Sequence, residues 1–190
     1  MTLNLTKGQK VELTKDNPGL KNIKIGLGWD VNRYSGGQNF DLDTSAFLLN
    51  NAGKCASEKD VIYFNNLKHA SGSVIHSGDN LTGAGEGDDE IITIDLMKVP
   101  IDFSKIVFVI NIYSADERKQ NFGMVSNCFG RVIDDSGKEL LKYELGEDYS
   151  TETGVIICEV YRHNNEWKFF AVGQGFRGGL GEISKNFGLN

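Results

Sequence analysis

Long apolar runs are missing from this 190-residue sequence, and the N-terminus lacks the apolar segment of a signal peptide. A membrane-spanning helix needs about 18 or more consecutive apolar residues, so the sequence predicts no integral membrane segment. A secretory leader needs an apolar stretch of about 7 to 15 residues, which the first residues do not supply. We therefore expect a cytoplasmic protein.

Cysteine is also scarce, with Cys55, Cys128 and Cys158 as the only three residues of this type. Their odd number, their wide separation and the lack of C-x-x-C spacing argue against a disulfide framework, a zinc site or a redox pair. Free cysteine packs as a small apolar residue. We therefore expect three buried, unreactive thiols.

Positive charge is the third shortage, because the formal net charge is −6 and the isoelectric point is near 5.1. Binding to nucleic acid requires a basic stripe, so we expect no nucleic-acid partner. Between Lys68 and Lys98 there is no Lys or Arg at all, whereas six acidic residues occur there: Asp79, Glu86, Asp88, Asp89, Glu90 and Asp95. Such a cluster repels itself unless water, an ion or a cationic partner compensates it.

Proline is rare, with two residues, and most apolar segments are short and rich in β-branched or aromatic residues, a pattern typical of strands. The expected strands are Lys10–Thr14, Asn22–Trp29, Leu42–Leu49, Val61–Phe64, Ile91–Leu96, Ile106–Tyr113, Cys128–Ile133, Val155–His163 and Trp167–Gly173. Asn164 and Asn165 predict a tight hairpin, because asparagine tolerates positive φ.

Helical signals are few and short. Asp116–Phe122 is one expected helix, with Ser114 as its N-cap, and Leu180–Phe187 is the other. No βαβ repeat or linker interrupts the chain. The predicted fold class is therefore mainly β, an antiparallel β-sandwich with a few short peripheral helices, in a single domain over residues 1–190.

The first candidate site lies at the start of an expected strand. Period-two alternation places Asp41 and Asp43 on one face and Phe40 and Leu42 on the other. Two carboxylates about 7 Å apart along a strand favour a nearby cation. The alternative is a solvated strand end.

The second candidate site is the segment that precedes the strand at residue 91. Calcium takes six to eight oxygens from carboxylates, amides, backbone carbonyls and water, and glycines let the chain fold so that carbonyls point inward. This segment supplies every kind of oxygen. Its candidate ligands are Asp79, Asn80, Gly83, Gly85, Asp88, Asp89 and Glu90. The alternative is a solvent-exposed acidic turn.

The choice of metal follows from the ligand types. Neither acidic segment contains cysteine or histidine, which disfavours zinc and copper, and an all-protein oxygen cage favours calcium over magnesium. Asp30 is a third possible contributor, or equally a turn residue. Enough carboxylates are present for about two Ca²⁺ ions. His76 lies close to the second segment, and we expect it at the surface.

Two other functions remain open alongside a non-catalytic calcium-binding protein. A metal-dependent phosphoryl hydrolase would use two ions as a clamp, but neither acidic segment contains a Lys, an Arg or an evident base. A purely structural scaffold would use calcium only to hold loops together. Calcium affinity would separate this scaffold from a sensor.

Several stretches in order along the chain resemble the signature segments of the TerD family of tellurite-resistance and stress-response proteins. They are Gly28–Asp30, Asn39–Asp43, Gly78–Gly83, Gly87–Glu90, Gln120–Gly123, Glu159–Arg162, Trp167–Phe169 and Ala171–Gly175. The resemblance implies a calcium-binding β-sandwich. It places metal ligands at Asp41, Asp43, Asp79, Asn80, Asp88, Asp89 and Glu90, with backbone oxygens around Gly83–Gly85. It also implies partners among other Ter and stress-operon proteins, some of them membrane-associated.

Overall fold

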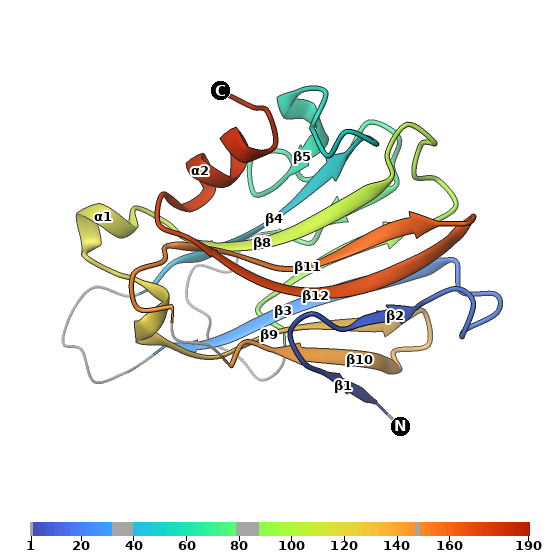
Figure 1. Ribbon diagram of the computed structural model, residues 1–190, viewed down its shortest axis with the longest axis horizontal. Coiled ribbons are helices and arrows are strands. Elements are labelled where there is room, and N and C mark those ends of the chain that lie inside the picture. The colour runs from blue at the N-terminus through green and yellow to red at the C-terminus, as the bar shows by residue number, and fades with distance from the viewer. Residues whose placement is uncertain (1, 32–39, 79–87, 147–148) are drawn as a thin grey trace.

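Two six-stranded sheets pack face to face in the computed structural model, which describes residues 2–31, 40–78, 88–146 and 149–190. Figure 1 shows the two layers, with the N-terminus at one side of the lower layer and helix α2 above the upper one. We call the sheets A and B. Sheet A has the order β1-β10-β9-β3-β7-β6, and sheet B has the order β2-β12-β11-β8-β4-β5.

The strands and helices have the following bounds. The strands of sheet A are β1 (Leu3–Leu5), β10 (Glu139–Glu144), β9 (Val125–Asp134), β3 (Asn22–Val31), β7 (Glu90–Asp95) and β6 (Val74–His76). Those of sheet B are β2 (Lys10–Glu12), β12 (Glu166–Phe176), β11 (Gly154–His163), β8 (Lys105–Ile112), β4 (Leu42–Leu49) and β5 (Val61–Ile62). The helices are α1 (Ala115–Arg118) and α2 (Gly179–Asn186), with short 3₁₀ turns at Glu58–Asp60 and Phe122–Met124.

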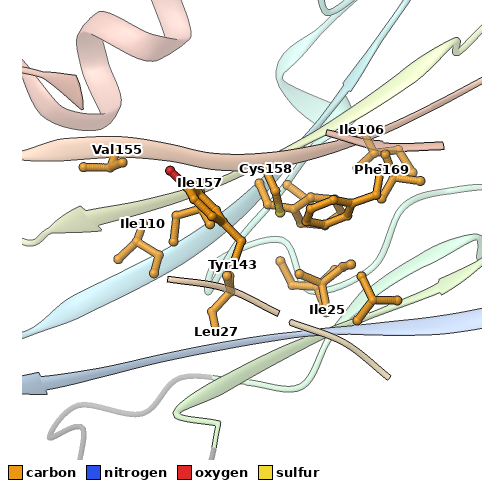
Figure 2. Close-up of a cluster of buried hydrophobic side chains, with 14 of the residues drawn as sticks. Ile25, Leu27, Ile106, Ile110, Tyr143, Val155, Ile157, Cys158 and Phe169 are labelled. Carbon is orange, nitrogen blue, oxygen red and sulfur yellow. The ribbon is translucent and has the colours of Figure 1, made fainter. Parts of the chain in front are cut away.

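The main core fills the space between the sheets. Ile25 and Leu27 of sheet A face Ile106 and Phe169 of sheet B, and all four are fully buried (Figure 2). Alternation along each strand sends every second side chain into this layer. Burial of apolar area on this scale is the main stabilising term of such a fold.

A second, smaller core lies on the outer face of sheet B. Phe47 and Leu49 of β4 point away from the main core and pack with Ile183 and Phe187 at α2. The rings of Phe47 and Phe187 are tilted, with centroids 5.2 Å apart. Both faces of β4 are therefore buried, and the strand ends in a continuous apolar run, Ala46–Leu49.

The predicted mainly β sandwich is confirmed, and each of the nine expected strands coincides with an observed one. Three strands were not predicted: β1, β6 and β10. One pairing also departs from the antiparallel pattern, because β1 runs parallel to β10. The Asn164–Asn165 hairpin is confirmed, with φ of 50° and 64° at the two residues. The three cysteines are buried and free, as expected.

The first helix is shorter than predicted. Only Ala115–Arg118 is helical, and a 3₁₀ turn follows at residue 122. Ser114 is the N-cap residue by position, as predicted, but its side chain does not cap the helix. Ser114 takes a left-handed conformation with φ of 48° and makes no side-chain capping bond, so it cannot present its hydroxyl to the first turn as an extended N-cap residue does. Among the described residues, no helix is long and apolar enough to cross a bilayer.

Gly173 provides a test of the packing. Its φ of +60° is left-handed, and a Cβ there would lie 2.2 Å from the hydroxyl oxygen of Tyr143, which is buried in the main core (Figure 2). Gly173→Ala should lower the free energy of unfolding by about 3 kcal/mol through backbone strain and overpacking. Gly137→Ala, with φ of +84° and open space around the new methyl group, should cost about 1 kcal/mol. Equal losses in urea denaturation would contradict the described contact.

Candidate metal centre

One end of the sandwich carries those predicted metal ligands that fall within the described residues. There β3 and β8 end while β4, β7 and β9 begin, at the left of Figure 1. Six of the predicted ligands lie at this end: Asp30, Asp41, Asp43, Asp88, Asp89 and Glu90. The other four, Asp79, Asn80, Gly83 and Gly85, lie outside the described residues.

Asp41 and Asp43 lie on one face, as the alternation predicts, and the structure shows that this is the outer face of sheet B. Asp43 is 6% exposed and pairs in register with Asn111 of β8, which is also 6% exposed. The side chains of Asp43 and Asn111 line a hollow of about 460 Å³ between β8, α1 and the start of α2. Asp116 and Glu117 of α1 line the same hollow, so most of its charged groups are carboxylates.

Three side-chain oxygens on this face are buried without a hydrogen bond among the residues that the structure describes. They are Oδ1 of Asp41, Oδ1 of Asn111 and Oγ of Ser45. A buried oxygen that lacks a donor costs about 1 to 3 kcal/mol, and an ionised carboxylate costs more. Acceptor oxygens beside a carboxylate-lined hollow form the type of donor set that a hard cation binds.

Asp41 has one cationic neighbour. The guanidinium Nη2 of Arg118 lies 3.6 Å from its Oδ2, and the same guanidinium stands 5.5 Å from the centre of the Tyr113 ring. The ion pair is long and leaves Oδ1 of Asp41 without a donor. Arg118 therefore compensates only part of the charge at the mouth of β4.

Asp88 points to the opposite side of the molecule, the outer face of sheet A. Its Oδ1 accepts a hydrogen bond of 2.7 Å from Nε of Arg131, and Nη1 of that arginine donates to Glu139 at 2.8 Å. These bonds raise the pKa of Arg131. The carboxylate lies directly over Gly26, where a Cβ would stand 2.2 Å from it, so glycine at this position lets Asp88 reach the arginine.

Asp89 is hydrogen-bonded to β3 through both its backbone and its side chain. Its Oδ2 accepts the backbone N–H of Trp29 at 2.9 Å. Burial raises the pKa of Asp89, the Trp29 hydrogen bond opposes this shift, and the nearby negative charges of Asp30, Asp88 and Glu90 add to it. Asp30 is exposed, and its Oδ2 accepts a 2.7 Å hydrogen bond from Nδ2 of Asn127.

Glu90 lies between the two sheets, at 2% exposure. Its Oε2 accepts hydrogen bonds from the backbone N–H of Thr44 at 2.9 Å and from the Thr44 hydroxyl, and it lies 3.2 Å from Nε2 of His76. Nδ1 of His76 accepts the N–H of Gly78 at 3.0 Å. Its proton is therefore on Nε2, which donates toward Thr44 and Glu90.

The position of His76 differs from the expectation that it lies at the surface. His76 is not a surface residue, because it is 3% exposed and forms part of the polar contact between sheets A and B. Its partners come from β4 and β7, which are distant in sequence, so no local pattern indicates its burial. A buried carboxylate needs such donors to offset desolvation, and Glu90 has three of them.

Within the described ranges, no group of three or more His, Cys, Asp or Glu side chains is arranged so that it could hold a metal ion. Six of the ten predicted ligand positions are present in those ranges, and they point to three different faces. Their assignment as ligands stays a prediction. Asn111 is not among the predicted ligands, although it is the single polar residue in the otherwise apolar stretch 106–112, a pattern that points to a special role.

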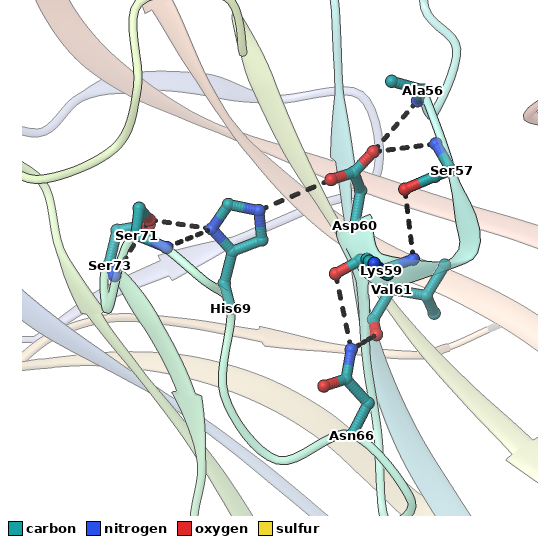
Figure 3. A network of polar contacts seen from close by, with 9 residues as sticks. All are labelled: Ala56, Ser57, Lys59, Asp60, Val61, Asn66, His69, Ser71 and Ser73. Atoms are coloured by element: carbon teal, nitrogen blue, oxygen red, sulfur yellow. Dashed lines mark hydrogen bonds and ion pairs between the residues drawn. The ribbon is translucent and has the colours of Figure 1, made fainter.

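A second polar network lies near the other end of β4 (Figure 3). Oδ1 of Asp60 stands 3.4 Å from Nε2 of His69, and Nδ1 of that ring stands 2.7 Å from Oγ of Ser71. This order of groups is that of a serine hydrolase triad. The Ser71 hydroxyl, however, also contacts Oγ of Ser73 at 2.7 Å and accepts the N–H of Ser73 at 3.2 Å. These contacts fix the hydroxyl within the turn, and the network is structural.

The remaining hydrogen bonds of this network also hold the local backbone in place. Oδ2 of Asp60 accepts the N–H groups of Ala56 at 3.0 Å and Ser57 at 2.9 Å. Nδ2 of Asn66 donates to the carbonyl of Val61 at 2.7 Å. Together these bonds connect residues 56–61 with residues 66–73 across a segment that has little regular structure.

The fold and the acidic end define a β-sandwich with carboxylates concentrated at one end, and comparison with known proteins gives the family. The TerD domain model matches residues 1–187. General stress protein 16U of Bacillus subtilis (strain 168) is 57% identical over 190 residues, which cover 100% of this chain and 98% of that protein. Tellurium resistance protein TerD of Serratia marcescens is 50% identical over 191 residues, covering 100% and 99%. The chain belongs to the TerD family.

A solved structure supports the fold independently. The crystal structure of a homologue of telluride resistance protein (TerD) from Streptomyces coelicolor A3(2) superposes with a TM-score of 0.72 at 21% identity, covering 90% of this chain and 100% of that one. At this identity the likeness concerns the fold alone. The two-sheet architecture is therefore that of a TerD relative.

The Glu90 group gives a stability test. Thr44→Val removes the hydroxyl that donates to Glu90 and leaves a buried carboxylate short of one donor, so it should cost about 1 to 3 kcal/mol in the free energy of unfolding. Thr93→Val, on the half-buried outer side of β7, should change stability by less than about 0.5 kcal/mol. Similar midpoints for both variants in urea denaturation would show that the Thr44 bond is not stabilising.

Proposed function

We propose that this chain is a non-catalytic, calcium-binding protein of the tellurite-resistance and stress-response type, and that it binds about two Ca²⁺ ions at the acidic end of the sandwich. The proposal includes a cytoplasmic location and partners among other Ter or stress-operon proteins. The names of the relatives in Bacillus subtilis and Serratia marcescens support the stress and tellurium context.

The observation that carries the calcium proposal is the pair of orphaned oxygens beside Asp43. Asp41 Oδ1 and Asn111 Oδ1 are buried without a hydrogen-bond partner in the described part of the chain. Asp43 and Asn111 face the same carboxylate-lined hollow. These residues fit a calcium ion, because they offer carboxylate and amide oxygens and no sulfur or imidazole.

The other described carboxylates fit less directly. Asp88 and Glu90 already have cationic or hydrogen-bonding partners in Arg131, Thr44 and His76. We propose that they hold the ends of the neighbouring strands, and that any contact they make with calcium requires those bonds to rearrange. Calcium itself would supply positive charge where Asp89 and its acidic neighbours repel one another.

Substitution tests the assignment of Asp41 and Asp43. Asp41→Asn and Asp43→Asn each remove one negative charge from the proposed site, and each should weaken calcium binding by about tenfold or more, in line with the energy of a charged contact. Binding is measured by calorimetry on metal-stripped protein. The matched control is Asp102→Asn, an exposed aspartate on the β7–β8 connection, which should leave the affinity unchanged.

One outcome would contradict the assignment of Asp41 and Asp43 to the calcium site. If both variants bind calcium with the affinity of the original protein, the outer face of sheet B is not part of the metal site. Thermal unfolding without calcium provides the folding check, because both variants must remain folded for the comparison to hold. Relief of like-charge repulsion predicts that neither variant is strongly destabilised in the metal-free state.

A further inference from the structure

The end of the sandwich opposite the acidic residues contains an arginine with unusual surroundings. Arg162, near the end of β11, is half-buried, and burial lowers its pKa. Its Nη2 donates to the carbonyl of Val99 at 2.5 Å and its Nε to that of Phe103 at 3.3 Å, while its guanidinium lies 4.4 Å from the ring centre of Trp167. All of these partners are neutral.

No carboxylate of the described residues forms an ion pair with Arg162. The contrast with two other arginines is clear, because Arg131 contacts Asp88 and Glu139, and Arg118 contacts Asp41. A partly desolvated cation with neutral partners only is an electrostatic cost to the folded protein. An external anion would offset that cost.

Arg162 lines a hollow of about 570 Å³ that holds two further cations. The side chains of Lys15 and Lys21 line it from the segment between β2 and β3, and neither forms an ion pair within the described part of the chain. One acidic residue lines it, Glu166, whose carboxylate accepts a hydrogen bond from the Thr14 hydroxyl. Three cations against one carboxylate give this hollow a positive balance in a protein whose net charge is −6.

We propose that this hollow is a binding site for a phosphate group, carried as a phosphate monoester. Arginine presents a planar fork of N–H donors that matches phosphate oxygens, and lysines add point charges. Three cations suit a dianion better than a single carboxylate. The site lies at the far end of β3 from the acidic residues, about 30 Å away along that ten-residue strand, so it is independent of calcium binding.

The residues near the rim of the hollow indicate what kind of molecule carries the phosphate. Met97 lines the hollow and is 75% exposed, and Ile101 on the same β7–β8 connection is 79% exposed. These are the two highest exposures among the large apolar residues that the structure describes. An apolar rim fits a phosphate on an organic body, which includes both a soluble ester and the headgroup of an anionic lipid.

The experiment uses the full chain with three probes: glycerol 3-phosphate, vesicles of phosphatidylcholine with phosphatidic acid, and acetate as a carboxylate control. We expect saturable binding of glycerol 3-phosphate by calorimetry, or binding to the phosphatidic acid vesicles, and much weaker binding of acetate. Vesicles of phosphatidylcholine alone should not bind. Binding to vesicles without binding of the soluble ester assigns the phosphate to a lipid headgroup.

Variants separate a built site from general electrostatic attraction. The double change Lys15→Gln with Lys21→Gln should weaken phosphate binding by about tenfold or more, with an unchanged melting temperature because both lysines are exposed. The control pair Lys24→Gln with Lys59→Gln removes the same charge from exposed positions outside the hollow and should bind as the original protein does. Arg162→Lys keeps the charge and should still weaken binding, because it removes the fork.

Three results would overturn the proposal. They are no binding of either phosphate probe, equal affinity for acetate and glycerol 3-phosphate, or equal losses in the test and control lysine pairs. None of these results bears on calcium binding, which concerns the opposite end of the molecule. If phosphate does not bind, the role of Arg162 is structural: it donates hydrogen bonds to the carbonyls of Val99 and Phe103.

Discussion

Crowded negative charge at one end of the sandwich is the constraint on which this structure depends. Antiparallel strands bring the starts of β4 and β7 and the end of β3 to one edge, and each carries carboxylates there. Neighbouring like charges raise the free energy of the folded state unless each has a compensating group. The protein separates them by face, and each face uses a different solution.

Between the sheets, the Glu90 side chain accepts hydrogen bonds from Thr44 and from the Nε2–H of His76, and these bonds offset the cost of its burial. On the outer face of sheet A, Asp88 rests over Gly26 and is neutralised by Arg131. On the outer face of sheet B the compensation is incomplete, because Asp41 and Asn111 keep buried oxygens without described donors. The incomplete face is where an external cation has most to contribute.

The sequence predicts much of this arrangement, for physical reasons that differ from element to element. Short β-branched runs with turn residues between them determine the strands, and period-two alternation correctly places Asp43 on the face opposite Phe40 and Leu42, which lie in the main core. Asp88 and Glu90 stand two positions apart, and the sequence gives no sign that one lies on the outer face of sheet A and the other between the sheets. The burial of His76 depends on contacts with residues 44 and 90, so it follows from tertiary packing and not from local pattern.

The two ends of the molecule have opposite electrostatic character. Carboxylates dominate where β4 and β7 begin, whereas Arg162, Lys15 and Lys21 surround a hollow where β3 begins. A sandwich suits this division, because each strand carries its residues from one end to the other and the rigid core keeps the ends apart. We propose that a TerD-family protein built in this way has room for a cation site and an anion site that do not interfere.

The most direct test of the central claim is a calorimetric titration of the metal-stripped protein with calcium, repeated with magnesium and followed by thermal unfolding at each end point. Two saturable calcium sites, a weak response to magnesium and a melting temperature that rises with calcium would agree with the account, since a ligand that binds only the folded state stabilises it. No heat of calcium binding and an unchanged melting temperature would contradict it.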